Sequence, residues 1–164
     1  MKKMIKIICV IMLLLVCGCS QSSKSQSQDM LSGHCLTASD QSYLQLNKDG
    51  HYVWYQNKNV TDDNYYEGTY EVYVGMEAID QLDSLSEYGF TKQEQLDYIE
   101  RNKDKGISVD DWYVMIQTRT KRVVQAQETL EKTRIVYAGV YYKDKKVYDA
   151  VNCNSANYSY FSVE

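Results

Sequence analysis

The chain has 164 residues, a length that fits one domain, and its formal net charge at pH 7 is −4. An acidic chain argues against binding to nucleic acid, and against docking on anionic lipid through its own side chains. Sixteen tyrosines, two tryptophans and no proline favour β-strands that have one face in solvent. The tyrosines reflect either strand propensity alone or a surface that binds sugars or proteins.

The first eighteen residues predict an export signal. Lys2, Lys3 and Lys6 give the chain a positive start, and the apolar run Ile7–Val16 follows them. This run is shorter than the roughly 18 to 20 residues that a helix needs to cross a bilayer. We therefore predict a signal peptide over residues 1–18 that is removed, rather than a permanent membrane helix.

The end of this segment resembles the lipobox of bacterial lipoproteins, in the run Val16-Cys17-Gly18-Cys19. The resemblance implies cleavage after Gly18 and lipidation of the Cys19 thiol. Two acyl chains on one cysteine hold a protein on a bilayer, so the resemblance implies a lipid anchor at the cell membrane, facing outside the cytoplasm. An ordinary secretory signal, cut after Gly18 or Ser20, is the alternative.

The mature chain differs from the whole chain in charge and in cysteines. Loss of the three N-terminal lysines lowers the formal net charge from −4 to −7. The serine- and glutamine-rich composition of residues 19–30 predicts a flexible tether. Only Cys35 and Cys153 remain after Cys19 is lipidated, and an even pair in an exported protein predicts a disulfide, which would join the first strand to one of the last. Two separately buried thiols are the alternative.

The folded domain, residues 31–164, begins with a β-hairpin. The segments 43–47 and 51–56 alternate around Asn47-Lys48-Asp49-Gly50, whose Asp-Gly pair supplies a tight turn. An acidic loop, 61–64, and a third strand, 68–73, follow.

The middle of the domain, about residues 76–105, has helical periodicity. Ala78, Ile79 and Leu82 recur at helical spacing, and Thr91 with Glu94 predicts the capping box of a second helix. The β pattern then returns over five segments: 112–118, 122–126, 134–142, 146–153 and 158–163. We therefore predict a mainly β fold, an antiparallel up-and-down barrel or a barrel-like sandwich of eight or nine strands, with a two-helix insertion.

The first hairpin also resembles a known class of domain. The run Asp49-Gly50-His51-Tyr52, followed by Gly68-Thr69-Tyr70, is similar to a signature of lipocalin-like domains in exported bacterial proteins, in particular uncharacterised lipoproteins of Gram-positive bacteria. The resemblance implies a lipocalin-like barrel. Its motifs mark hairpins rather than chemistry, and a fold does not fix a function.

The sequence contains no motif for catalysis, metal binding or a cofactor, so we predict a protein that is not an enzyme. In the first of two hypotheses, a barrel mouth lined by Tyr52, Trp54, Tyr70 and Trp112 binds a small apolar or sugar ligand. In the second, the barrel is filled, and outer tyrosines with the helical insertion bind an extracellular protein, as inhibitor or immunity-type lipoproteins do. Plain core packing is the alternative for each aromatic side chain.

Overall fold

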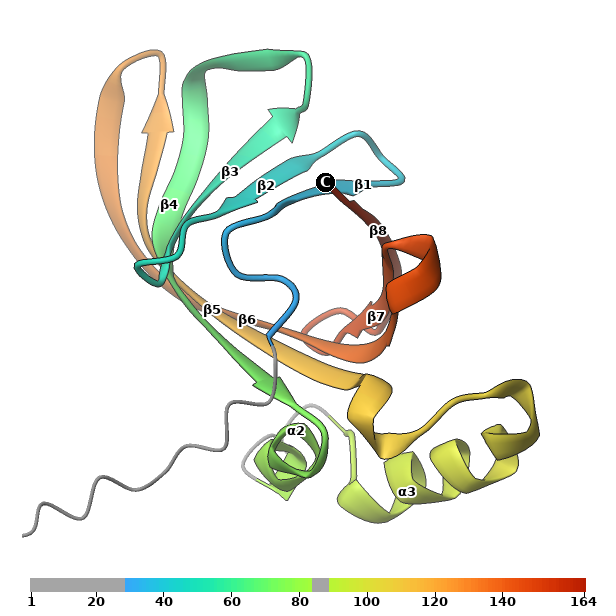
Figure 1. Ribbon diagram of the computed structural model, residues 1–164. Coiled ribbons are helices and arrows are strands. Elements are labelled where there is room, and N and C mark those ends of the chain that lie inside the picture. The colour runs from blue at the N-terminus through green and yellow to red at the C-terminus, as the bar shows by residue number, and fades with distance from the viewer. Residues whose placement is uncertain (1–28, 84–88) are drawn as a thin grey trace, which may run out of the picture.

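The computed structural model describes residues 29–83 and 89–164, and in it eight antiparallel strands close into a barrel (Figure 1). Each strand pairs with its neighbours in the sequence, and β1 pairs with β8. The mainly β fold and the two helices are confirmed. The strands are β1 (Cys35–Ala38), β2 (Tyr43–Leu46), β3 (His51–Asn57), β4 (Val60–Val74), β5 (Trp112–Val124), β6 (Gln127–Tyr142), β7 (Val147–Asn152) and β8 (Asn157–Val163).

The predicted signal peptide, with Gly18 and Cys19, lies outside the described residues. Among the residues that are described, none of the helices combines the length and the apolar character that crossing a membrane requires.

The predicted first hairpin is confirmed as β2 and β3. Gly50 has a φ of 84° in its turn, a conformation that glycine adopts without steric cost. The turn is held by the amide of Gly50, which donates to the carbonyl of Asn47 (3.1 Å), and by the amide of His51, which donates to the Asp49 carboxylate (3.0 Å). The predicted acidic loop 61–64 is wrong, because this segment belongs to β4, which runs from Val60 to Val74.

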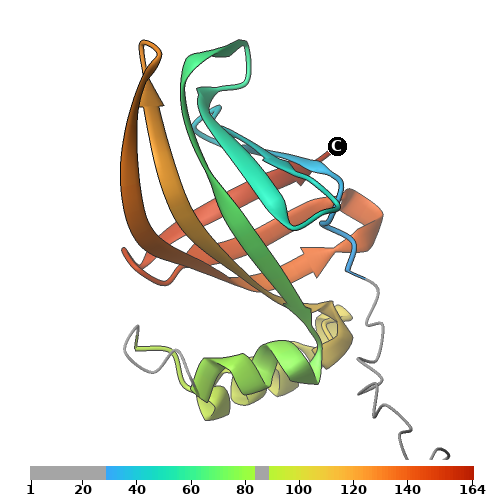
Figure 2. The ribbon, with the colours of Figure 1, turned by 90° about the vertical axis from the view of Figure 1, so that its left-hand side faces the viewer.

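The hairpin of β5 and β6 is longer than the sequence predicts. The two segments predicted at 112–118 and 122–126 are one strand, and β6 begins seven residues before the predicted start at residue 134. Its turn, Gln125 and Ala126, has positive φ angles of 50° and 63° without any glycine. Figure 2 shows this hairpin and that of β3 and β4 projecting from one end of the barrel, away from the helices.

Two helices connect β4 to β5: α2 (Met76–Gln81) and α3 (Lys92–Arg101). The predicted capping box of α3 is confirmed, since the Thr91 side chain accepts from the amide of Glu94 and the Glu94 carboxylate accepts from the amide of Thr91. Apolar residues of the insertion pack on the outer wall formed by β5 and β6, so both faces of this wall are buried. Short 3-10 turns complete the connections: η2 (Lys103–Lys105), η3 (Val109–Asp111) and, between β6 and β7, η4 (Lys143–Lys145).

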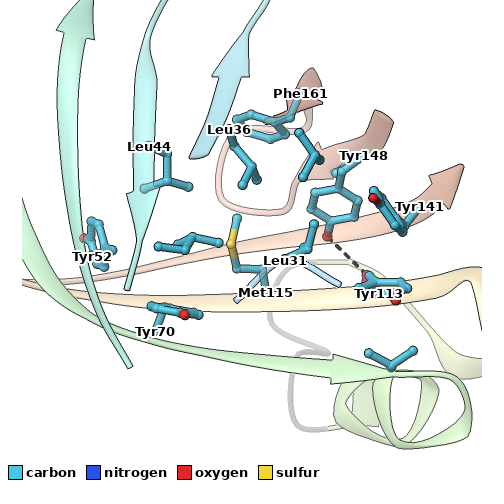
Figure 3. Packing of buried hydrophobic residues seen from close by; sticks show 14 residues of the cluster. Leu31, Leu36, Leu44, Tyr52, Tyr70, Tyr113, Met115, Tyr141, Tyr148 and Phe161 are labelled. Carbon is cyan, nitrogen blue, oxygen red and sulfur yellow. Dashed lines mark hydrogen bonds between the residues drawn. The ribbon is translucent and has the colours of Figure 1, made fainter. Parts of the chain in front are cut away.

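One end of the barrel, which we call the closed end, is filled by an apolar core (Figure 3). The segment before β1 runs across this end (Figure 1) and buries Leu31 completely. The Asp29 carboxylate accepts from the amide of Leu31 (2.9 Å), which fixes the segment. Leu31 therefore plugs the closed end, and the side chains packed with it include Leu36, Leu44, Tyr113, Met115, Tyr148 and Phe161.

The predicted disulfide between Cys35 and Cys153 is wrong, since both thiols are free. Cys35 lies at the closed end, where its backbone pairs with Glu164, just after β8. Cys153 follows Asn152, which pairs with Asn157 at the start of β8. The length of β8, about 20 Å at 3.4 Å per residue, thus separates two Cα atoms that a disulfide requires within about 7 Å. Hydrogen bonds between β1 and β8 close the barrel instead.

We expect two thiols to titrate with Ellman's reagent in unreduced, denatured protein that begins at Ser20. In the folded protein the half-exposed Cys35 should react first. Cys153 should react slowly, because burial raises its pKa to about 11 and keeps the thiol protonated. Cys35→Ser should remove the fast phase and leave the slow one. Fewer than two thiols in denaturant would contradict the free cysteines.

Candidate functional site

The end of the barrel opposite Leu31 is open and hollow. A cavity of about 410 Å³, which we call the cup, lies inside the wall at this end. Its lining comes from every strand except β4 and includes Trp54, Gln117, Arg119, Tyr137, Asn152 and Ser159. The cup continues over the rim into a shallower hollow beside Trp54 and Tyr66, next to the β3–β4 hairpin.

Side chains of β5 that point into the barrel contribute to both the apolar core and the cup. Tyr113, Met115, Gln117 and Arg119 follow one another at every second position and so share the inner face. The first two are in the apolar core at the closed end, whereas the last two line the cup. The inner face therefore changes from apolar to polar about halfway along the barrel.

Gln117 is a buried polar group at the floor of the cup. Its side chain is only 3% exposed, and its one hydrogen bond to the described residues is a long contact from Nε2 to the Met115 sulfur (3.8 Å). Burying an amide that makes only one weak hydrogen bond lowers the stability of the fold, unless another group forms the missing hydrogen bonds. Gln117 is therefore well placed to bind a polar ligand in the cup.

Arg119 is held rigidly on the wall of the cup. Its guanidinium stacks on the ring of Tyr66, 3.7 Å from the centroid, and Nη1 lies 3.3 Å from the Glu131 carboxylate. The buried hydroxyl of Tyr52 is close by; burial raises its pKa to about 12, and the positive charge of Arg119 opposes that rise. Because Glu131 neutralises Arg119, the cup offers a fixed planar donor without a large net charge.

Of the four aromatic residues predicted to line the mouth, only Trp54 lines the cup. Tyr52 is buried in the core beneath it. Tyr70 lies at the closed end, where its hydroxyl donates to the carbonyl of Asn47 (2.6 Å). Trp112 is on the outer wall, because its neighbour Tyr113 takes the inner position.

The sequence analysis missed the polar half of the lining. Gln117, Arg119 and Asn152 were overlooked because single polar residues in a strand usually face solvent. The signal that could have found the first two is their spacing, since they continue the inner alternation of Tyr113 and Met115. Within residues 29–83 and 89–164, no three histidine, cysteine, aspartate or glutamate side chains come close enough together to hold a metal ion.

Comparisons with protein-family models, with curated proteins and with solved structures find no significant match to this chain.

Proposed function

We propose that the protein is a lipid-anchored, non-enzymatic binding protein of the bacterial cell surface, and that its cup holds a small sugar-like ligand. The observation that carries this proposal is the polar cavity of about 410 Å³ inside an otherwise filled barrel. Ligand sites are concave, and a few well-placed polar groups in them fix the ligand.

The lining favours a sugar over an apolar ligand. The apolar half of the barrel is occupied by its own side chains, with Leu31 as the plug. The hollow half instead presents the amides of Gln117 and Asn152, the hydroxyl of Ser159 and the indole of Trp54. Amides and hydroxyls match the donors and acceptors of a sugar, and an aromatic ring matches its apolar face.

The barrel topology supports a lipocalin-like assignment, which we include in the proposal. Eight strands in strict neighbour order, closed by β1 and β8, make an up-and-down barrel. A ligand site in the mouth of such a barrel agrees with where barrels of this size place ligands.

The proposed anchor leaves the cup free. The chain enters the barrel at the closed end, through Asp29 and Leu31, whereas the cup opens at the opposite end. A domain held through its N-terminus therefore has room to point the cup away from the membrane.

We expect Cys19→Ala to release the protein from the membrane fraction, because the thiol that accepts the lipid is gone. The measurement is partition between membrane and soluble fractions after an alkaline wash. Cys17→Ala is the matched control and should stay on the membrane. Retention of the Cys19 variant, or release of both variants, would contradict the assignment of the anchor to Cys19.

We expect Gln117→Met to weaken binding of the preferred sugar by about tenfold or more, since the variant keeps the shape of the side chain but removes the buried amide. A panel of mono- and disaccharides, followed by calorimetry on the best binder, provides the measurement. Gln45→Met, on the outer face of β2, is the control and should bind as the unaltered protein does. Unchanged affinity in Gln117→Met, or no saccharide bound at millimolar concentration, would refute a sugar site in the cup.

A protein-binding role is the second candidate. Tyr43, Tyr55 and Tyr65 form a row of rings across β2, β3 and β4, with centroids 6.5 and 5.8 Å apart. Tyrosine is enriched at protein interfaces. This role would be favoured by a protein partner that no longer binds when the three tyrosines are changed to serine but still binds the Gln117→Met variant.

A further inference from the structure

The outer wall carries a second hollow, whose lining shares only Tyr158 with that of the cup. A groove of about 200 Å³ lies between α3 and the outer faces of β6 and β7. Five aromatic side chains line it: Phe90, Tyr98, Trp112, Tyr142 and Tyr158. The ring of Tyr98 meets that of Trp112 edge-on, with centroids 6.0 Å apart. The groove is therefore an aromatic box, and its volume suits a ligand of few atoms.

A carboxylate without a countercharge lies in this box. Asp149, on β7, is half-buried in the lining, and no hydrogen bond or ion pair joins its side chain to any described residue. Burial raises its pKa. A half-buried carboxylate without a partner is unfavourable, and a bound cation would relieve that cost.

A second polar group in the box also lacks a partner. Trp112 is 5% exposed, and its indole Nε1 is buried with no acceptor among the described residues. Buried indole N–H groups normally have an acceptor. Because this N–H is also closed to solvent, a ligand in the groove meets the ring of Trp112 rather than its N–H.

We propose that this groove binds a small organic ammonium ion. The aromatic lining attracts the cation, and the carboxylate of Asp149 provides the opposite charge. The groove shares only Tyr158 with the cup, and the sugar proposal rests on other residues, so failure of one proposal leaves the other untouched.

The first test compares two probes on the full chain in detergent. Choline carries the cation and the hydroxyl; 3,3-dimethylbutan-1-ol has the same shape without the charge. We expect choline to bind saturably in calorimetry and the neutral alcohol to bind at least about tenfold more weakly. Equal affinities, or no saturable binding of choline at millimolar concentration, would overturn the proposal. This comparison needs no variant and so does not depend on a variant's folding.

The second test locates the site. Asp149→Asn keeps the shape of the side chain and should weaken choline binding by about tenfold or more, whereas Asp144→Asn, in the exposed turn η4, should not. In Trp54→Phe the only tryptophan left is Trp112, so choline should still change the fluorescence excited selectively in tryptophan. The proposal would be refuted if Asp149→Asn bound choline with unchanged affinity. It would also be refuted if choline changed the fluorescence of Trp112→Phe but not that of Trp54→Phe, because the ligand would then lie elsewhere.

Discussion

Gly139→Ala is expected to lower the free energy of unfolding by about 3 kcal/mol or more, because β6 and β7 leave no room for a side chain there. A Cβ atom on Gly139 would lie 2.0 Å from the carbonyl oxygen of Asp149 and 2.6 Å from the Cα of Ala150. Both are backbone atoms, so the strands must separate to admit it. The midpoint of denaturant unfolding, followed by tyrosine fluorescence, gives the measurement.

Gly106→Ala is the control for this variant. Gly106 has a φ of 80°, and an added Cβ would meet nothing within 4 Å. The substitution should therefore lower the free energy of unfolding by about 1 kcal/mol, the strain of placing alanine at a positive φ. If both variants lost the same free energy of unfolding, the close approach of β6 and β7 would not be the reason that position 139 requires glycine.

Tyr148→Ala is expected to have the largest effect among the core residues, about 4 kcal/mol, because it empties the centre of the closed end. Tyr148 is fully buried, and its ring stacks on Phe161 with centroids 6.0 Å apart (Figure 3). Its hydroxyl lies 3.0 Å from the carbonyl oxygen of Tyr137 and 3.2 Å from that of Tyr113.

Two companion variants separate the contributions. Tyr148→Phe keeps the ring and loses only the hydroxyl, so it should cost about 1 kcal/mol. Tyr160→Ala removes a ring of the same kind that is 49% exposed on β8, and it should cost less than about 1 kcal/mol. If Tyr148→Ala unfolded at the same denaturant concentration as Tyr160→Ala, the packing at the closed end would be incorrectly described.

Local signals predicted the parts of the fold that local interactions determine. The hairpin of β2 and β3 follows from Asp49-Gly50, and the start of α3 follows from Thr91 and Glu94. The β5–β6 hairpin lacks such a signal, because its turn residues, Gln125 and Ala126, are not typical of positive φ. Most residues of the projecting part are polar, and the few apolar ones, Val123, Val124 and Leu130, do not alternate regularly along the two strands.

The candidate site depends on which face of a strand points inward, and the sequence left this open for β5. Residues 112–116 are all buried, because the inner face meets the core and the outer face meets the helical insertion. An apolar run of this kind has no period of two, so Trp112 and Tyr113 were equal candidates for the interior. Placing Cys35 and Cys153 at opposite ends likewise required the register of β8.

The strict neighbour order of the strands has a consequence for how the protein folds. Seven of the eight pairings join strands that follow each other in the chain, and only that of β1 with β8 joins its two ends. Closing so long a loop carries the largest entropy cost, so we expect this pairing to form last and to open first. Within the strands, three residue pairs join β1 to each of its neighbours, and a few backbone hydrogen bonds beside them, such as those between Cys35 and Glu164, add to the contact. Its release would uncover the edges of β2 and β8, the place at which a partly folded chain is exposed to aggregation.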